Sequence, residues 1–139
     1  MADVIRKVDY YYTTTPHKAG EATRILNALR VAGVNLLALH GFPSARKAQI
    51  DFVASNGAAL VAAATAAKIK LSKPKSAFLV DGEDRPGALA GILAKLSAAK
   101  INVTAVTALS AGVGRYGAIL WVKAPDAKRA AAALGAMST

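Results

Sequence analysis

The residues best suited to chemistry lie in one short segment, Asp84-Arg85-Pro86-Gly87-Ala88-Leu89. Its residue types predict a turn that leads from a strand into a helix, with Asp84 as the helix cap and Pro86 in the first helical turn. Gly87 has no side chain, so a ligand or another stretch of backbone can come close to it. The unbonded N–H groups of a first helical turn attract a carboxylate or another anion. We therefore expect this turn to bind a small anionic group.

Acidic and amide side chains beside this turn indicate what kind of ligand it suits. Asp81, Glu83 and Asp84 could receive the α-amino group of an amino acid whose carboxylate lies on the helix N–H groups. Asn102 follows Asp84 by eighteen residues, at the predicted start of the next strand, and its side chain can both donate and accept a hydrogen bond. Alternatively, Asp84 only caps the helix, Asn102 only satisfies backbone groups at a corner, and the acidic turn is merely solvated.

The same pattern occurs earlier in the chain, because the sequence contains an internal repeat. A shift of 67 residues places Gly20 on Gly87 and Asn35 on Asn102, and six of the sixteen positions in this segment are identical. A chance match of two helix patterns would not keep a glycine, an asparagine and the following strands in register. We infer a duplication of one α+β unit.

The first copy differs from the second at the turn itself. His17 stands at the place of Asp84, and the proline at the helix start is missing. His17 is either a ligand contact or simply an exposed turn residue. Further downstream, the same shift places residues 50–53 on residues 117–120.

The two copies predict the same order of elements, from apolar periodicity and from turn residues. In the first copy we expect a strand at 8–14, a helix at 19–32, strands at 35–41 and 48–54 joined by a turn at Pro43-Ser44, and a helix at 58–67. In the second copy we expect a strand at 77–80, a helix at 86–99, strands at 102–109 and 115–123, and a helix at 125–134. Ile69 and Leu71 alternate with polar residues, as in a short fourth strand, whereas residues 135–139 leave little room for one.

This order of elements predicts the α+β class. Each copy is expected to form a ferredoxin-like βαββαβ unit, an antiparallel sheet with both helices on one face. We place the two domains at residues 1–72 and 73–139. Six strand residues offer more apolar and aromatic surface than one layer of helices needs to cover the sheets, so we expect the sheets to pair within the chain and between chains, as in a homodimer. These residues are Tyr10, Tyr12, Val53, Phe78, Val80 and Trp121.

The second copy resembles the ACT domain, a small regulatory module that binds amino acids. The resemblance rests on the turn at 84–89, on the helix stripe Ile92, Leu93 and Leu96, and on Ile101-Asn102-Val103. It is strong over residues 78–122 and weaker over residues 8–54, and it implies a stand-alone protein of two tandem ACT domains.

The resemblance also implies where a ligand binds. In this family, amino acids bind where the strand-to-helix loop of one domain meets a neighbouring sheet. That role falls on Asp84, Gly87 and Asn102, and in the first copy on His17, Gly20 and Asn35. The first copy could instead only complete the pocket of the second.

Composition excludes several other classes of function. There is no cysteine, the two histidines are far apart, and no set of residues for catalysis can be assembled, so we expect a non-catalytic protein without metal or cofactor. No signal peptide or membrane span is evident, so we expect the cytoplasm. The net charge of +10 includes a cluster of lysines that lacks the interleaved aromatics of a nucleic-acid site. The cluster, Lys68, Lys70, Lys73 and Lys75, is either a solvated linker or a docking surface for a metabolic enzyme that the chain regulates.

Overall fold

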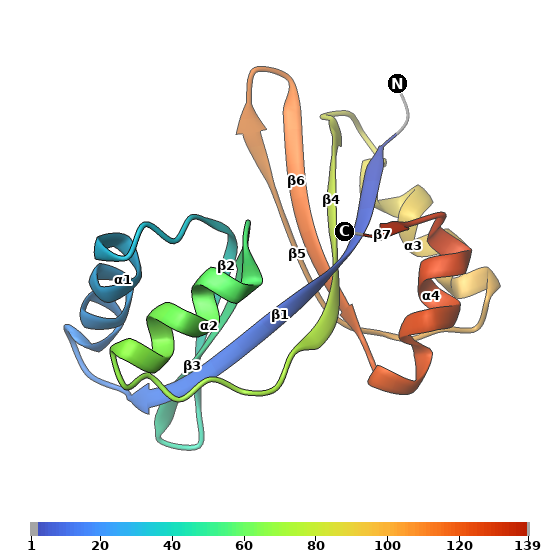
Figure 1. Cartoon of the computed structure of the whole chain (residues 1–139). Helices are drawn as coiled ribbons and strands as arrows, with labels where there is room; N and C mark the ends of the chain where they lie inside the picture. The colour runs from blue at the N-terminus through green and yellow to red at the C-terminus, as the bar shows by residue number, and fades with distance from the viewer. Residues whose placement is uncertain (1–2, 139) are drawn as a thin grey trace. The chain divides into compact units, whose positions relative to one another are not determined.

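The computed structural model describes residues 3–138, which group into two compact units. The N unit is Asp9–Lys75. The C unit consists of the stretch that ends at Val8 together with Ser76 and the residues after it. Strand β1 (Val4–Pro16) therefore contributes residues to both units (Figure 1). The domain boundary expected between residues 72 and 73 stays a prediction.

The N unit is an antiparallel sheet covered on one face by two helices (Figure 1). Its strands lie in the order β2–β3–β1, and the core forms where Ile50 and Phe52 of the sheet meet Ile25 and Leu29 of the first helix and Leu60 of the second. The elements besides β1 are α1 (Glu21–Val31), β2 (Leu36–Ser44), β3 (Lys47–Ala54) and α2 (Gly57–Ala66).

The segment after α2 runs beside β1 without becoming a regular strand. The Ser72 N–H donates to the Tyr12 carbonyl at 2.8 Å, and the Thr13 hydroxyl donates to the Lys70 carbonyl at 2.9 Å. Side-chain bonds therefore replace part of the ladder that the alternation at residues 69–71 led us to expect.

The C unit repeats this architecture around the other end of β1. Its strands lie in the order β1–β4–β6–β5, and the largest fully buried side chains of its core are Phe78, Leu96 and Leu120. The elements are β4 (Lys75–Glu83), α3 (Ala88–Ala98), β5 (Val103–Gly112), β6 (Arg115–Val122), the single turn η1 (Ala124–Asp126), α4 (Ala127–Leu134) and β7 (Met137–Ser138).

The predicted fold class is confirmed, with two corrections. Strand β7 exists and pairs in parallel with β1, although residues 135–139 were expected to leave little room for it. Phe78 and Val80 lie in the core beneath the helices and not on the bare face of the sheet. Within residues 3–138, no helix combines the length and the apolar character needed to cross a membrane.

The duplication is visible in the backbone, but its register changes once. Helices α1 and α3 have bounds that differ by 67 residues at both ends. In the sheets, Leu39 lies opposite Phe52, whereas Val106 lies opposite Leu120. Phe52 therefore corresponds to Leu120, and the expected match of residues 50–53 to 117–120 is wrong by one residue.

The extra residue is Ala111, at the bulge in β5 where the pairing shifts between Ser110 and Gly112. The N unit turns at Ala45 and Arg46, not at the predicted Pro43-Ser44, because β2 extends to Ser44. The C unit turns at Val113 and Gly114, and residues 112–114 all have positive φ. A shift without gaps cannot reveal such an insertion, because alternating apolar residues fit almost as well one position away.

Candidate functional site

A cavity of about 320 Å³ lies in the C unit where β4 leads into α3. Five of the six residues of the predicted turn line it, together with Ala90 of the helix. The sheet contributes Ala108, Leu109, Ser110 and Tyr116. Its volume is near the lower end of about 300–1,000 Å³ that is typical of small-molecule sites, so a small ligand suits it.

Helix α3 begins at Ala88, after a glycine in the left-handed conformation. Gly87 is the N-cap residue, with φ of 77°, and no side chain caps the helix. The prediction that Asp84 caps it is therefore wrong: Asp84 is exposed, and its own N–H donates to the Gly114 carbonyl at 2.9 Å. Pro86 precedes the helix and does not line the cavity.

Two backbone donors are left over at this helix start. The Ala88 N–H donates to the Arg85 carbonyl at 3.3 Å, and the Gly91 N–H donates to the Gly87 carbonyl at 3.4 Å. Between them, the N–H groups of Leu89 and Ala90 have no acceptor among residues 3–138. Because the helix dipole adds a partial positive charge there, an anion is the natural acceptor.

Tyr116 is the cavity residue that sequence reasoning missed. The side chain is only 4% exposed, and its hydroxyl makes no hydrogen bond of ordinary geometry within the described part of the chain. Burial, together with the nearby Asp3 carboxylate, raises the pKa of Tyr116 to about 12. The hydroxyl is therefore protonated at neutral pH and can donate to the nearby Asp3 carboxylate or to a ligand.

Arg85 lines the cavity, but its guanidinium is already engaged. It donates to both carboxylate oxygens of Asp3, at 3.1 and 3.0 Å, and to the Glu83 carbonyl at 2.8 Å. This ion pair holds the pKa of Asp3 below its ordinary value. A Cβ at Gly82 would collide with the Asp3 carboxylate, so the glycine makes this contact possible. The ion pair joins residues 82 apart in sequence, and no local pattern could have indicated it.

The other predicted residues do not line this cavity. Asn102 is exposed and precedes β5. In the N unit, His17, Gly20 and Asn35 are also exposed; Gly20 is the N-cap of α1, and the Asn35 carbonyl accepts the Ser55 N–H at 2.9 Å.

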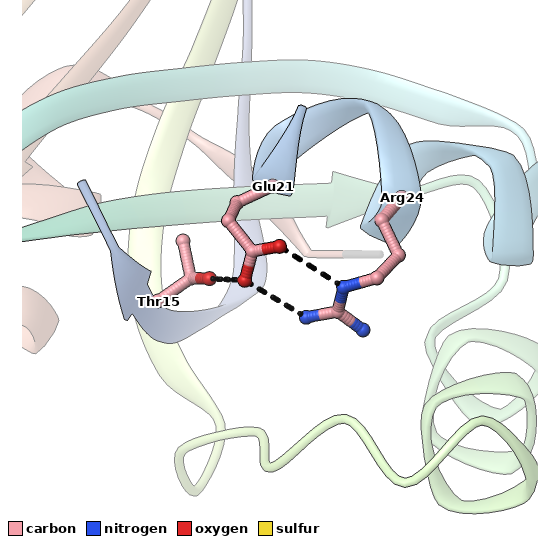
Figure 2. Close-up of polar contacts among 3 residues, drawn as sticks. All are labelled: Thr15, Glu21 and Arg24. Atoms are coloured by element: carbon pink, nitrogen blue, oxygen red, sulfur yellow. Dashed lines mark hydrogen bonds and ion pairs between the residues drawn. The ribbon is translucent and has the colours of Figure 1, made fainter. Parts of the chain in front are cut away.

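The strand-to-helix turn of the N unit contains a carboxylate of its own. The Thr15 hydroxyl donates to Glu21 Oε1 at 3.0 Å, and Arg24 Nε lies 3.4 Å from Glu21 Oε2 (Figure 2). The hydrogen bonds from Arg24 and Thr15 lower the pKa of Glu21, so its carboxylate is charged at neutral pH. No group of three or more potential metal ligands occurs in either unit, as far as the structure describes them.

Comparison with known proteins identifies the C unit. Residues 76–138 match the family model of the ACT domain. The C unit is an ACT domain. A search of curated proteins gave no significant match.

Solved structures extend the same fold to the whole chain. Protein BT0572 from Bacteroides thetaiotaomicron is 18% identical, with 94% of this chain and 88% of that chain covered and a TM-score of 0.75. The ligand-free regulatory subunit of aspartate kinase from Thermus thermophilus is 16% identical, with 97% and 96% covered and a TM-score of 0.63. The corresponding subunit from Thermus flavus is 15% identical, with 96% and 94% covered and a TM-score of 0.59. The whole chain thus shares the fold of these structures.

Proposed function

We propose that this ACT-domain protein is a non-catalytic regulator that binds a small amino acid in the C-unit cavity. The observation that carries the proposal is the coincidence, at one cavity, of two unbonded helix N–H groups and a buried phenol that forms no well-aligned hydrogen bond. Each of these groups can donate a hydrogen bond, and an α-carboxylate accepts several.

The remaining cavity residues fit the rest of an amino acid. The carboxylate lies on the N–H groups of Leu89 and Ala90, while the exposed Asp84 carboxylate receives the α-ammonium group. Ala108 and Leu109 face the side chain of the ligand, and the cavity volume of about 320 Å³ suits a small one. Arg85 is not the carboxylate receptor, because Asp3 already occupies its guanidinium.

Regulation without catalysis is the mode of action that we propose. A ligand shifts a protein toward the arrangement that it binds more tightly, and by no more than that difference in affinity. Two of the similar structures are named as regulatory subunits of aspartate kinase, and amino-acid control of such an enzyme in the cytoplasm is the role that we propose here.

Calorimetry with the twenty amino acids, on protein refolded from denaturant to empty the site, tests this proposal. We expect at least one small amino acid to bind and to raise the melting temperature. Asp84→Asn should weaken that binding, whereas Asp126→Asn, which removes a carboxylate from the start of α4, should leave it unchanged. If no amino acid at millimolar concentration binds or stabilises the refolded protein, the proposal is wrong.

A second candidate function is docking on an enzyme without a ligand of the chain's own. Strand β5 favours it: it forms the outer edge of the C-unit sheet, nine of its ten residues are exposed, and it carries no charge. Such an edge can pair with a strand of another chain, either a metabolic enzyme or a second copy. Val106→Lys on this edge should abolish co-purification with an aspartate-kinase-type catalytic chain while amino-acid binding persists. Retained co-purification would remove β5 from consideration.

A further inference from the structure

Helices α1 and α3 begin in the same way, which fixes the equivalent residues of the two turns. Gly20 and Gly87 are both N-cap residues in the left-handed conformation, with φ of 90° and 77°. The carbonyl of each accepts a hydrogen bond from the N–H four residues later, at 3.0 and 3.4 Å. The first helical residue is therefore Glu21 in the N unit and Ala88 in the C unit.

The two turns differ in the polar side chains that surround these first helical residues. In the N unit, Glu21 contacts Thr15 and Arg24, and all three side chains meet at the turn (Figure 2). The equivalent residues of the C unit, 67 positions later, are Ala88, Gly82 and Gly91. The C-unit turn lacks every one of the three polar side chains, and a cavity lies there.

We propose that Glu21 is the built-in occupant of the N-unit turn and stands where a ligand's carboxylate would otherwise bind. The carboxylate belongs to the first residue of α1, where the helix dipole favours negative charge. It accepts a hydrogen bond from the hydroxyl of Thr15. Thr15 is only 5% exposed, and this bond gives its buried hydroxyl a partner. A free carboxylate can enter this turn only by displacing Glu21.

Asp3 does not close the C unit in the same way. Its carboxylate is bound to the Arg85 guanidinium, and Asp3 is not among the residues that line the cavity. The N–H groups of Leu89 and Ala90 have no acceptor within residues 3–138, and neither do those of Ala22 and Thr23 at the start of α1. The two turns differ in the Glu21 carboxylate, which is replaced by Ala88 in the C unit. Each chain thus has one closed turn, in the N unit, and one open turn, in the C unit. If the proposed function holds, one amino acid should bind per chain.

Glu21→Ala in the full chain should open the N-unit turn to acetate, the simplest carboxylate probe. Backbone amide resonances of residues 18–24 are followed by NMR during titration with sodium acetate at constant ionic strength, with sodium chloride as counter-salt. We expect saturable shifts in Glu21→Ala and none in the wild type. At acetate ten times above its dissociation constant, the folded-to-unfolded ratio should rise about elevenfold.

Glu21→Gln is the matched control, because its amide still fills the turn and can still accept the Thr15 hydroxyl. It should show no saturable acetate shifts. Amides 18–24 that respond equally in the wild type, or not at all in a folded Glu21→Ala, overturn the proposal. If Glu21→Ala is unfolded without acetate, acetate should refold it, and failure to refold is equally contradictory.

The proposed function is tested separately, at the amides of residues 84–90 in the wild type. Their failure to respond to any amino acid would contradict amino-acid binding in the C unit. It would leave the acetate result at Glu21 intact, because that result depends only on the N-unit turn.

Discussion

Arg85 donates hydrogen bonds to the Asp3 carboxylate from both of its terminal nitrogens, at 3.1 and 3.0 Å. Asp3 lies just before β1, and Arg85 lies in the turn before α3. The ion pair therefore links the residue before β1 to the edge of the candidate site. Because of this contact, the Arg85 guanidinium is not available to the carboxylate of a ligand. Two predictions about stability follow from this pair and the glycine beneath it.

Asp3→Asn should destabilise the protein in a way that depends on pH. The pKa of Asp3 in the folded protein is lowered from its ordinary value of 3.8, so the ion pair stabilises the fold above that value and is lost as the pH falls through the lowered pKa. We expect a cost of about 1 kcal/mol at pH 7, as for a well-aligned ion pair near the surface. Urea unfolding of both proteins between pH 2.5 and 7 measures it. A difference in unfolding free energy that does not shrink on acidification would contradict the prediction.

Gly82→Ala should destabilise the C unit, because the added methyl group collides with the Asp3 carboxylate and lies within 3.1 Å of the Tyr116 ring. Overpacking of this kind costs about 1–3 kcal/mol. Gly117→Ala is the control: its methyl group would lie 4.0 Å from the nearest neighbour, the Val80 carbonyl. Thermal unfolding should separate the two variants, and equal melting temperatures would show that Asp3 moves aside without cost.

Lys100→Gly should stabilise the protein. Lys100 follows helix α3 with φ of 58°, and its counterpart after α1 is Gly33, with φ of 75°. A side chain is strained in this conformation and glycine is not, so we expect a gain of up to about 1 kcal/mol. Lys95→Gly, inside α3, is the control and should instead lose about 1 kcal/mol. Chemical denaturation measures both, and a loss at Lys100 would show that its side chain contributes more than the strain costs.

Local patterns predicted most of the fold. Helices α1 and α3 were predicted from buried residues that recur at the helical period. These residues are Ile25 and Leu29 in α1, and Ile92 and Leu96 in α3. The exact strand register could not be predicted, because the extra residue at the β5 bulge, Ala111, shifts an alternating pattern onto one that fits nearly as well.

Only the part of the candidate site that lies within one short segment of the chain could be predicted from the sequence. The turn at 84–89 stands where expected, because glycine and proline determine backbone geometry within a few residues. Asn102 was expected there from its distance along the chain and from the resemblance to the ACT domain, neither of which determines where the side chain points, and it does not line the cavity. Tyr116 and Asp3 reach the site through strand pairing and the path of β1, which are long-range consequences of the fold.

Tyr116→Phe should separate the ligand role of this phenol from its structural role. Without ligand the hydroxyl forms no well-aligned hydrogen bond and interacts only with the nearby Asp3 carboxylate, so its removal should leave stability at pH 7 nearly unchanged. Because the folded-state pKa is raised to about 12 from 10.0, wild-type stability should fall between pH 10 and 12, and Tyr116→Phe should lose that part of the decline. Amino-acid binding should weaken about tenfold, the loss of one hydrogen bond to a carboxylate. Calorimetry and alkaline unfolding measure the two effects, and unchanged affinity would remove Tyr116 from the ligand site.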